Sequence, residues 1–389
     1  MCFAAGPMVL TPLSEINGRK PVFLGTYALF KGESFDNAGR DTQKFGGVVT
    51  DLFDPMSRGI PMSFFATAAF SGGLGQLVSG YIVASSSWRW IYWHQFIING
   101  ILMLAIAIFF KETRGPVLLS RKAKALNTIT EVSKDFISFP NTQTHWRVES
   151  DEQRAKISRM IKLSLTRPFC ELISFRKLHI LIQPDLLFTE RVVFWFSIWI
   201  SFSWALIFLF FTGLVFISMC VGAILGNIFY PFEENLYRRY GHQPPNLAIL
   251  KRACSGWHMQ ETASNTADNP EARIYSACIL SIFMALGMFM YGATSFPSVP
   301  WIFPAIAISV VTFGAYAIYL SVFTYLADIY TTYASSTMAA QSFCRNILAG
   351  CLPLVVNIMF RRLTFVGAAS LLGGIALLLR YMDPVFDLL

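Results

Sequence analysis

Charged residues are scarce in this chain of 389 residues: 14% are Asp, Glu, Lys or Arg, whereas a soluble domain carries about 25%. Hydrophobic residues make up 54% of the chain, and its 36 phenylalanines suit a lipid-facing surface or an apolar pocket. So few charges over this length exclude an ordinary water-soluble core. We therefore expect an all-α membrane protein whose main partner is the lipid bilayer.

The chain also lacks the residue arrangements that bind metals or perform common catalysis. Its seven cysteines include no CxxC pair and no Cys/His cluster. No metal-binding helix pair, phosphate-binding loop, nucleophile elbow or haem motif is present, and His94 beside Trp93 suits a membrane interface better than catalysis. We predict no metal site, no cofactor and no enzymatic activity.

A net charge of +8 does not indicate nucleic-acid binding here, because the basic residues are concentrated in particular loops. Fifteen of the 31 Lys and Arg residues lie between Lys111 and Arg191, interleaved with nine acidic residues, and five more lie between Pro231 and Arg273. Basic loops between apolar segments are typical of the cytoplasmic side of a membrane protein. We predict no nucleic-acid partner.

Apolar runs divide the chain into segments that can cross about 30 Å of hydrocarbon, which takes roughly 20 residues. They lie near residues 61–84, 90–110, 191–211, 213–231, 274–292, 301–327, 335–360 and 363–380. Only Thr212 and Gly213 separate the third run from the fourth, so these two form one long broken helix or lack a loop between them. The pattern predicts a helical part over residues 1–110, a basic cytoplasmic loop over 111–190, and a helical half over 191–389 with a polar loop at 241–273.

The segment from Ala327 to Phe360 bears most directly on function. An apolar helix ends at Asp328, a short polar turn follows, and the next apolar run carries Arg345 well inside it. An arginine within a membrane segment faces a bundle interior, a water-filled cavity or a partner. The alternative is that Arg345 lies near a cytoplasmic end and reaches toward the headgroups, and that Asp328 lies at the same surface.

A row of small residues marks the first long apolar run. Ala68, Gly72, Gly75 and Ser79 follow one another at spacings of four, three and four, with Gly80 next to them. Such a face lets a neighbouring helix backbone approach closely, and several glycines in one span also make a bendable helix plausible.

The sequence GPMVLTPLSEINGRK, from Gly6, places Glu15 shortly before Gly18, Arg19 and Lys20. A carboxylate and two cations in a tight turn between helices can form an ion-pair latch that favours one conformation by about 1 kcal/mol. A plain polar loop explains the same residues equally well.

Several segments resemble the fungal drug:proton antiporter group of the major facilitator superfamily. Gly6 to Tyr27 resembles that group's loop between the second and third helices, G-P-x-x-x-x-P-L-S-E-x-x-G-R-R-P. Further segments resemble the fifth, sixth, seventh, ninth, tenth and eleventh helices: GGVVTDLFDPMSRGIPMSFF, SWRWIYWHQFIINGILMLAIAIFFKETRGPVLLSRKAKALN, LLFTERVVFWFSIWISFSWALIFLFF, EARIYSACILS, TSFPSVPWIFPAIAI, YLADIY, YASS and AAQSFCRNILAG. Together they cover about two thirds of the chain.

Departures from this resemblance are concentrated in the first 110 residues. The family has twelve helices; here the first is absent, the second and third are partial, and KGESFDNAGRDTQK stands in place of the fourth. The fifth-helix signature G-P-x-L-G-P appears as Gly72-Gly73-Leu74-Gly75-Gln76, without its prolines. The expected fold is an incomplete major facilitator fold with about eight or nine membrane helices of twelve, as a decayed gene or incorrect exon boundaries would produce.

The resemblance implies two halves that rock about a central cavity and use the proton gradient to export drugs or other small amphipathic or cationic molecules. Asp328 and Arg345 are then candidates for proton coupling. Charges that would form gates at the membrane surface are Glu15 with Arg19, Asp51 with Arg58, and Glu233 with Arg238. Residues that would line the substrate cavity are Trp199, Ser203, Trp204, Tyr319 and Gln341, although each of them can simply pack against lipid or a neighbouring helix.

Two functional classes remain open from the sequence. One is a proton-coupled transporter, expected as a monomer in the plasma membrane rather than the vacuolar membrane. The other is a non-transporting truncated remnant of such a transporter, because a fold without several N-terminal helices leaves other helices without partners.

Overall fold

The computed structural model describes residues 14, 18–29, 46–54, 57–70, 72–134, 146, 148, 191–209, 215–240, 272–329 and 334–386. Every element that it defines in these ranges is an α-helix, which confirms the predicted fold class. The helices are α2 (Arg19–Leu29), α4 (Gly59–Phe70), α5 (Gly72–Ser85), α6 (Arg89–Phe109), α7 (Gly115–Lys134), α10 (Arg191–Leu209), α11 (Val215–Tyr240), α13 (Ala272–Thr294), α14 (Ile302–Ile329) and α15 (Ala334–Phe386).

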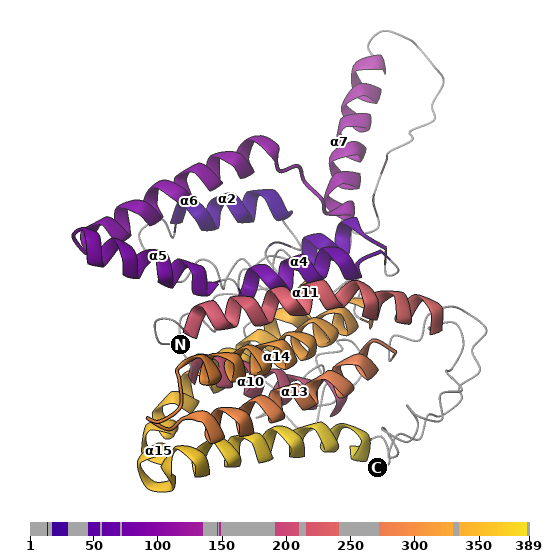
Figure 1. Cartoon of the computed structure of the whole chain (residues 1–389). Coiled ribbons are helices and arrows are strands. Elements are labelled where there is room, and N and C mark those ends of the chain that lie inside the picture. The colour runs from indigo at the N-terminus through magenta and orange to yellow at the C-terminus, as the bar shows by residue number, and fades with distance from the viewer. Residues whose placement is uncertain are drawn as a thin grey trace, which may run out of the picture.

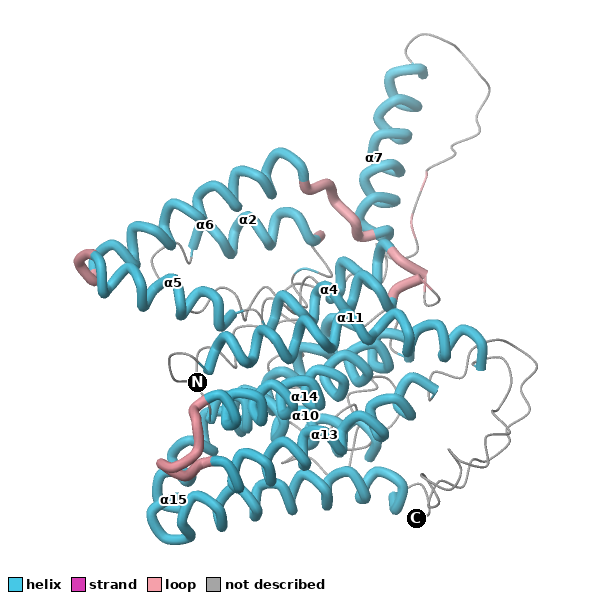
Figure 2. The backbone as a smooth tube through the Cα atoms, in the orientation of Figure 1, coloured by secondary structure: helices cyan, strands magenta, loops and turns pink. Residues whose placement is uncertain are grey.

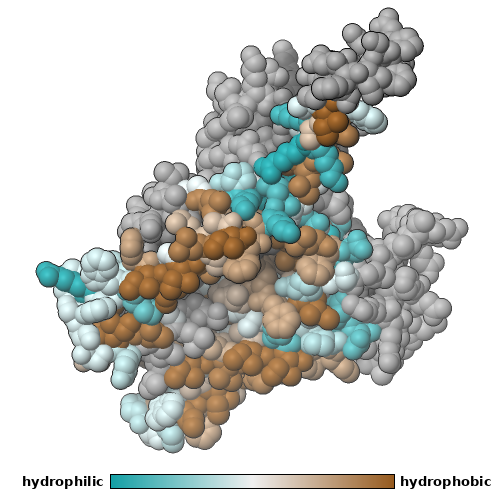
Figure 3. Space-filling view, turned by 90° about the horizontal axis from the view of Figure 1, so that it is seen from above, coloured by the Kyte–Doolittle hydropathy of each residue, from teal (hydrophilic) through white to brown (hydrophobic). Residues whose placement is uncertain are grey.

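Six of the described helical stretches are long and apolar enough to cross a membrane. They are Arg89–Phe109, Phe216–Asn235, Ser276–Thr294, Ile302–Ile329, Thr337–Val356 and Ile358–Arg380, and the shorter apolar stretches Gly59–Phe70 and Trp195–Ile207 accompany them. Figure 3 shows apolar side chains across the middle of one face of the molecule, with polar side chains toward its two ends and around α7. The chain is an integral, multi-pass membrane protein.

Helix α14 forms the centre of the C-terminal bundle and contacts α10, α11, α13 and α15 (Figure 1). Its side chains are apolar on all sides, and nearly every residue from Ala307 to Ala327 is buried, as expected for a helix surrounded by others. Gly287 of α13 and Gly314 of α14 permit this close contact, because a Cβ at either position would overlap the facing helix.

The helices before residue 110 lie along one side of this bundle (Figure 1). Helix α4 contacts α11 and α14, α5 contacts α11 and α6, and α2 contacts α6. No residue of α6 is buried: Met103 and Ile106 are half-buried against Phe23 and Val48, and many of its other apolar side chains are exposed. Helix α7 projects away from the bundle, as Figure 2 shows.

Two helical runs depart from regular geometry. The run predicted at 61–84 forms α4 and α5, on either side of residue 71. Helix α15 contains a break at Thr364, with φ 64° and ψ 167°, which separates the runs predicted at 335–360 and 363–380. Among the described residues, no atom lies within 4 Å of a Cβ built at Gly75 or Gly80, and the close helix approach predicted along this face stays a prediction.

Candidate functional site

One end of the bundle, where α7 begins, gathers buried charges into two networks; we refer to it as the charged end, defined by Arg19, Asp51, Arg58, Arg273 and Asp328. In the first network Asp51 lies between two arginines. Its Oδ2 is 2.9 Å from Nε of Arg19, and its Oδ1 is 3.1 Å from Nη1 of Arg114. The Arg19 side chain is 1% exposed, and a buried cation requires an opposite charge and hydrogen-bond partners in place of water. The shared Asp51 carboxylate provides both.

Glu112 fixes the start of α2 to the end of α6. Its carboxylate accepts hydrogen bonds from the backbone N–H groups of Arg19 (2.8 Å) and Lys20 (3.2 Å), which begin α2 and have no partner within that helix. Gly18 precedes them with φ +100°, and a Cβ there would overlap the Glu112 carboxylate. Glycine is therefore required at this turn both for its backbone conformation and for the space it leaves.

The second network joins four helices through Asp328 and Glu234. Nη1 of Arg58, at the start of α4, lies 2.7 Å from Oδ1 of Asp328 in α14. Nε of Arg273 in α13 lies 2.7 Å from Oδ2 of Asp328, and its Nη1 lies 3.3 Å from Oε2 of Glu234 in α11. The Tyr230 hydroxyl donates to the same Glu234 oxygen over 2.8 Å. The side chains of both arginines and both carboxylates in this network are at most 8% exposed.

Arg58 also connects the two networks. It donates to the backbone carbonyls of Thr50 (3.4 Å) and Phe53 (3.3 Å), in the segment that carries Asp51, and to the carbonyl of Ala327 (2.9 Å). Burial lowers the pKa of the Arg58 guanidinium, whereas the adjacent Asp328 carboxylate raises it. An arginine so placed remains charged and holds α4 against the end of α14.

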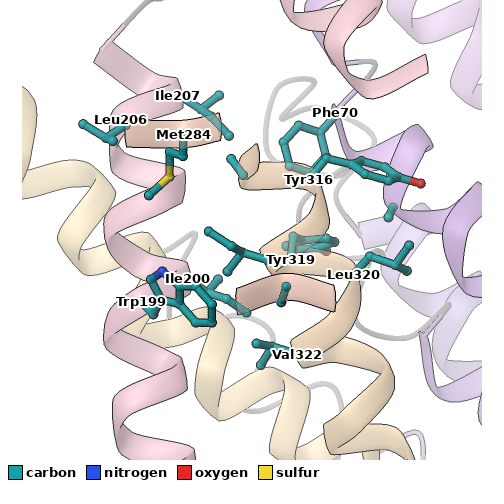
Figure 4. Close-up of a cluster of buried hydrophobic side chains, with 14 of the residues drawn as sticks. Phe70, Trp199, Ile200, Leu206, Ile207, Met284, Tyr316, Tyr319, Leu320 and Val322 are labelled. Atoms are coloured by element: carbon teal, nitrogen blue, oxygen red, sulfur yellow. The ribbon is translucent and has the colours of Figure 1, made fainter. Parts of the chain in front are cut away.

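In the interior of the bundle, a cluster of aromatic rings joins α4, one of the helices before residue 110, to α10 and α14 of the C-terminal bundle. Phe70, at the end of α4, contacts Trp204 of α10 (ring centroids 4.9 Å apart) and Tyr316 and Tyr319 of α14 (5.6 Å each). Trp204 stacks on Tyr319 at 5.2 Å, and Tyr319 stacks on Phe323 at 4.3 Å. Figure 4 shows Phe70 beside Tyr316, with Tyr319 on the same helix.

Arg345 of α15 lies against these rings. Its guanidinium carbon is 4.5 Å from the Trp204 centroid and 5.6 Å from the Tyr319 centroid, and the residue is 3% exposed. Arg345 therefore lies in the bundle interior, and the alternative in which it reaches toward the headgroups is wrong. Within the described part of the chain, Nη1 of Arg345 and the side-chain polar atoms of Gln341 and Ser342 have no hydrogen-bond partner.

A set of hydrogen bonds lies next to the aromatic cluster and also crosses from α4 to the C-terminal bundle. The Tyr316 hydroxyl donates to the Ser63 carbonyl (3.0 Å) and lies 3.3 Å from the Thr67 hydroxyl, to which Nδ2 of Asn227 in α11 donates. Gly226 of α11 leaves the space that the Tyr316 ring occupies.

The structure changes the pairing of the predicted gate charges. Asp51 does not pair with Arg58, because Arg19 and Arg114 already occupy both of its oxygens. Arg58 pairs instead with Asp328. Asp328 lies one residue before the end of α14, and its side chain is enclosed in an ion network.

The other predicted gate residues are described only in part. Arg273, which was not among the predicted gate residues, pairs with Glu234, while Glu233 faces Ser276. Gly6, Glu15 and the side chain of Arg238 lie outside the described residues, so the predicted latch between Glu15 and Arg19 and the pair of Glu233 with Arg238 stay predictions.

Of the predicted cavity residues, Trp204 and Tyr319 meet at Arg345, and Gln341 shares its face of α15 at a spacing of four residues. Trp199 stacks on Phe196 at 6.4 Å instead, and the Ser203 hydroxyl bonds within its own helix to the Trp199 carbonyl (2.8 Å).

Several residues of the site lie outside the motifs and candidates predicted from the sequence. Glu112, Arg114 and Arg273 stand in the segments KETRG and EARIYSACILS, which were interpreted only as family-like stretches. Charges that flank apolar runs were the available signal, because each lies within a few residues of a helix end. Phe70 and Tyr316 carried no signal that distinguished them from other aromatic residues.

Residues 45–353 match the family model described as Major Facilitator Superfamily. The chain is 28% identical to the transporter paaT of Penicillium rubens over 96% of this chain and 67% of that protein. It is 26% identical to the major facilitator superfamily multidrug transporter mdrA of Aspergillus fumigatus over 96% of this chain and 60% of the relative. It thus spans about two thirds or less of the length of these relatives, which are described as transporters and not as enzymes.

Among solved structures, the chain is similar in fold to the human organic anion transporter MFSD10. The TM-score is 0.56 at 13% sequence identity, and the similarity covers 98% of this chain and 80% of that one. At this identity the comparison supports the fold of the chain and carries no information about its substrate.

Proposed function

Because this chain belongs to the Major Facilitator Superfamily, we propose that it is a secondary transporter, and no enzyme, that exports small amphipathic molecules in exchange for protons. Its relatives include fungal efflux and multidrug transporters. We further propose that it acts as a monomer in the plasma membrane.

The observation that carries this proposal is the link between the two groups of helices at the charged end. Arg58 binds Asp328 on α14, and α7, the described helix of the basic loop, begins at this end, which we therefore place on the cytoplasmic side. Farther inside, Phe70 brings α4 into contact with the aromatic rings of α10 and α14. An ion-pair gate at one end and an aromatic site in the interior are what alternating access requires.

Proton coupling follows from the way carboxylates are shared in the second network. Asp328 neutralises two arginines, and Glu234 contacts one of them. Protonation of either carboxylate would leave a buried arginine without full compensation and would weaken the contact between α4 and α14. A proton could thereby exchange with the closed gate, which assigns Asp328 and Glu234 to coupling.

The test is pH-gradient-driven uptake into liposomes that contain the purified full chain. Rhodamine 6G and radiolabelled 1-naphthoate serve as cationic and anionic probes, and empty liposomes correct for passive entry. We expect gradient-dependent uptake of at least one probe, abolished by Asp328→Asn and retained by Asp54→Asn, which alters an exposed carboxylate. Equal uptake by empty and protein-containing liposomes for every probe would contradict the proposal.

The alternative function, a non-transporting relative, is favoured by one observation. None of the 21 residues of α6 is buried, whereas α14 is enclosed by other helices. Such a protein would insert into the membrane and unfold in a cooperative thermal transition, as a folded transporter does. It would nevertheless show no gradient-dependent uptake in the same assay.

A further inference from the structure

Arg345 is a buried cation beside which the described part of the structure places no carboxylate. The acidic residues of α11 and α14 lie in or next to the network at the charged end, where Arg58 and Arg273 bind Asp328 and Glu234. Within the described residues, no ion pair includes Arg345; Nε lies 3.5 Å from Oδ1 of its neighbour Asn346, and Nη1 has no partner.

A buried arginine with no opposite charge beside it lowers the folding stability of the protein without ligand. A buried charge normally has an opposite charge and enough hydrogen-bond partners to replace the water it has lost. The faces of Trp204 and Tyr319 supply a cation–π contact, which offsets part of that loss but leaves the net charge in place.

Further unsatisfied donors lie on the same face of α15. Gln341 and Ser342 precede Arg345 by four and three residues, so the three side chains share one side of the helix. Both are fully buried, and both have polar side-chain atoms without a partner in the described part of the structure. A guanidinium, an amide and a hydroxyl that converge in this way match the several acceptor sites of a carboxylate.

We propose that Arg345 binds the carboxylate of an aromatic or otherwise planar apolar acid, with Gln341 and Ser342 as additional donors. The apolar body of the ligand would lie against Trp204 and Tyr319, which contact the guanidinium, and against Phe70, which packs on both of these rings. Arg345 also repels cations, so this site opposes the cationic substrates that its aromatic rings alone would suggest. The inference rests on the proposed transport function only in treating this ligand as the substrate.

The site is closed in this conformation, because Phe70 of α4 covers it from the other group of helices. Separation of α4 from α14 would uncover it. Ligand binding and the state of the Arg58–Asp328 gate are therefore coupled through α4.

The experiment measures affinity of the purified full chain, in lipid nanodiscs, for 1-naphthoate and for its uncharged isostere 1-naphthamide. We expect the carboxylate to bind at least about tenfold more tightly, as one charge-assisted hydrogen-bond pair provides. Arg345→Gln should remove this preference, and Arg345→Lys should keep part of it, since lysine retains the charge but not the planar fork. Arg361→Gln, at an exposed arginine of the same helix, should leave it unchanged.

A wild type that binds both probes equally well overturns the proposal, and this comparison requires no variant that could misfold. Preserved preference in Arg345→Gln overturns it too. Thermal unfolding of the empty protein separates a binding role from a structural one. The empty Arg345→Gln variant should be at least as stable as wild type, because it loses an unpaired buried charge. A clearly lower midpoint for the empty variant would mean that Arg345 serves the fold, and would also contradict the proposal.

Failure of the site and failure of transport give different results. Preference for 1-naphthoate without uptake by liposomes supports the site and contradicts the transport function. Uptake of rhodamine 6G without any preference for the carboxylate supports transport and contradicts the site.

Discussion

Arg58, at the start of α4, donates a hydrogen bond to Asp328, at the end of α14, over 2.7 Å and a separation of 270 positions in the sequence. The other oxygen of Asp328 lies 2.7 Å from Arg273, which in turn contacts Glu234 at 3.3 Å. Asp328 is thus shared by two buried arginines, whereas Arg273 has a second acidic partner. The members of this network consequently differ in how much the fold depends on each.

Asp328→Asn should destabilise the protein more than Arg58→Gln does. The first change leaves two arginines without their shared carboxylate, which costs about 3–5 kcal/mol for a buried pair. The second leaves Asp328 still paired with Arg273, so we expect a smaller loss. Thermal unfolding of the two variants in the same detergent measures the difference, with Asp54→Asn as an exposed control. Equal losses would show that Asp328 does not serve both arginines.

Gly59→Ala and Gly80→Ala should shift stability in opposite directions. A Cβ at Gly59 would overlap the Glu234 carboxylate and the Tyr230 hydroxyl, so the ion network must move, at a cost of about 1–3 kcal/mol. A Cβ at Gly80, within α5, meets no atom of the described residues within 4 Å, and alanine favours the helix there by up to about 1 kcal/mol. Unfolding midpoints of both variants test this. A stabilising Gly59→Ala would mean that α4 and α11 are farther apart than described.

The helices were predictable from sequence because membrane-spanning segments are marked by their length and apolarity alone. Each of the apolar runs we predicted is helical over its described residues except at the run ends Phe110 and Trp301, and a break at Thr364 falls near the start of the last run. The pairing of charges was not predictable in the same way. Asp51 and Arg58 are close in sequence, yet each binds residues from other helices, since tertiary contacts decide which buried charges meet.

The interior site was predictable in part. Arg345 stood out because a cation is costly within an apolar run, and Trp204, Tyr319 and Gln341 were identified as cavity candidates. Phe70 and Tyr316 were not, because 15% of the chain is aromatic and only three-dimensional contacts distinguish these two. The limits of the three predicted parts, at residues 110 and 190, remain predictions.

Thr364→Gly should stabilise the protein. Thr364 has φ 64° and ψ 167°, a conformation that is essentially restricted to glycine and costs about 1–3 kcal/mol for other residues. The preceding Leu363 lies in regular helix, so Leu363→Gly should instead destabilise by about 1 kcal/mol. Unfolding midpoints that fall in both variants would indicate that Thr364 has contacts that outweigh its backbone strain.

Tyr316→Phe should change the rate of transport more than the apparent affinity for substrate. The variant keeps the ring that contacts Phe70 at 5.6 Å but loses the hydroxyl, which binds Ser63 and Thr67 of α4. These hydrogen bonds hold α14 to α4 in the closed conformation. The loss of one of them lowers the stability of that conformation by about 0.5–1.5 kcal/mol. The closed conformation should therefore be less populated, with an altered turnover and an apparent KM close to that of wild type. Liposome uptake over a range of probe concentrations separates the two quantities, and Tyr81→Phe, at a residue 75% exposed on α5, is the matched control. A raised KM with unchanged turnover would instead place the Tyr316 hydroxyl in contact with the substrate, since an interaction made equally in the ground and transition states affects KM alone.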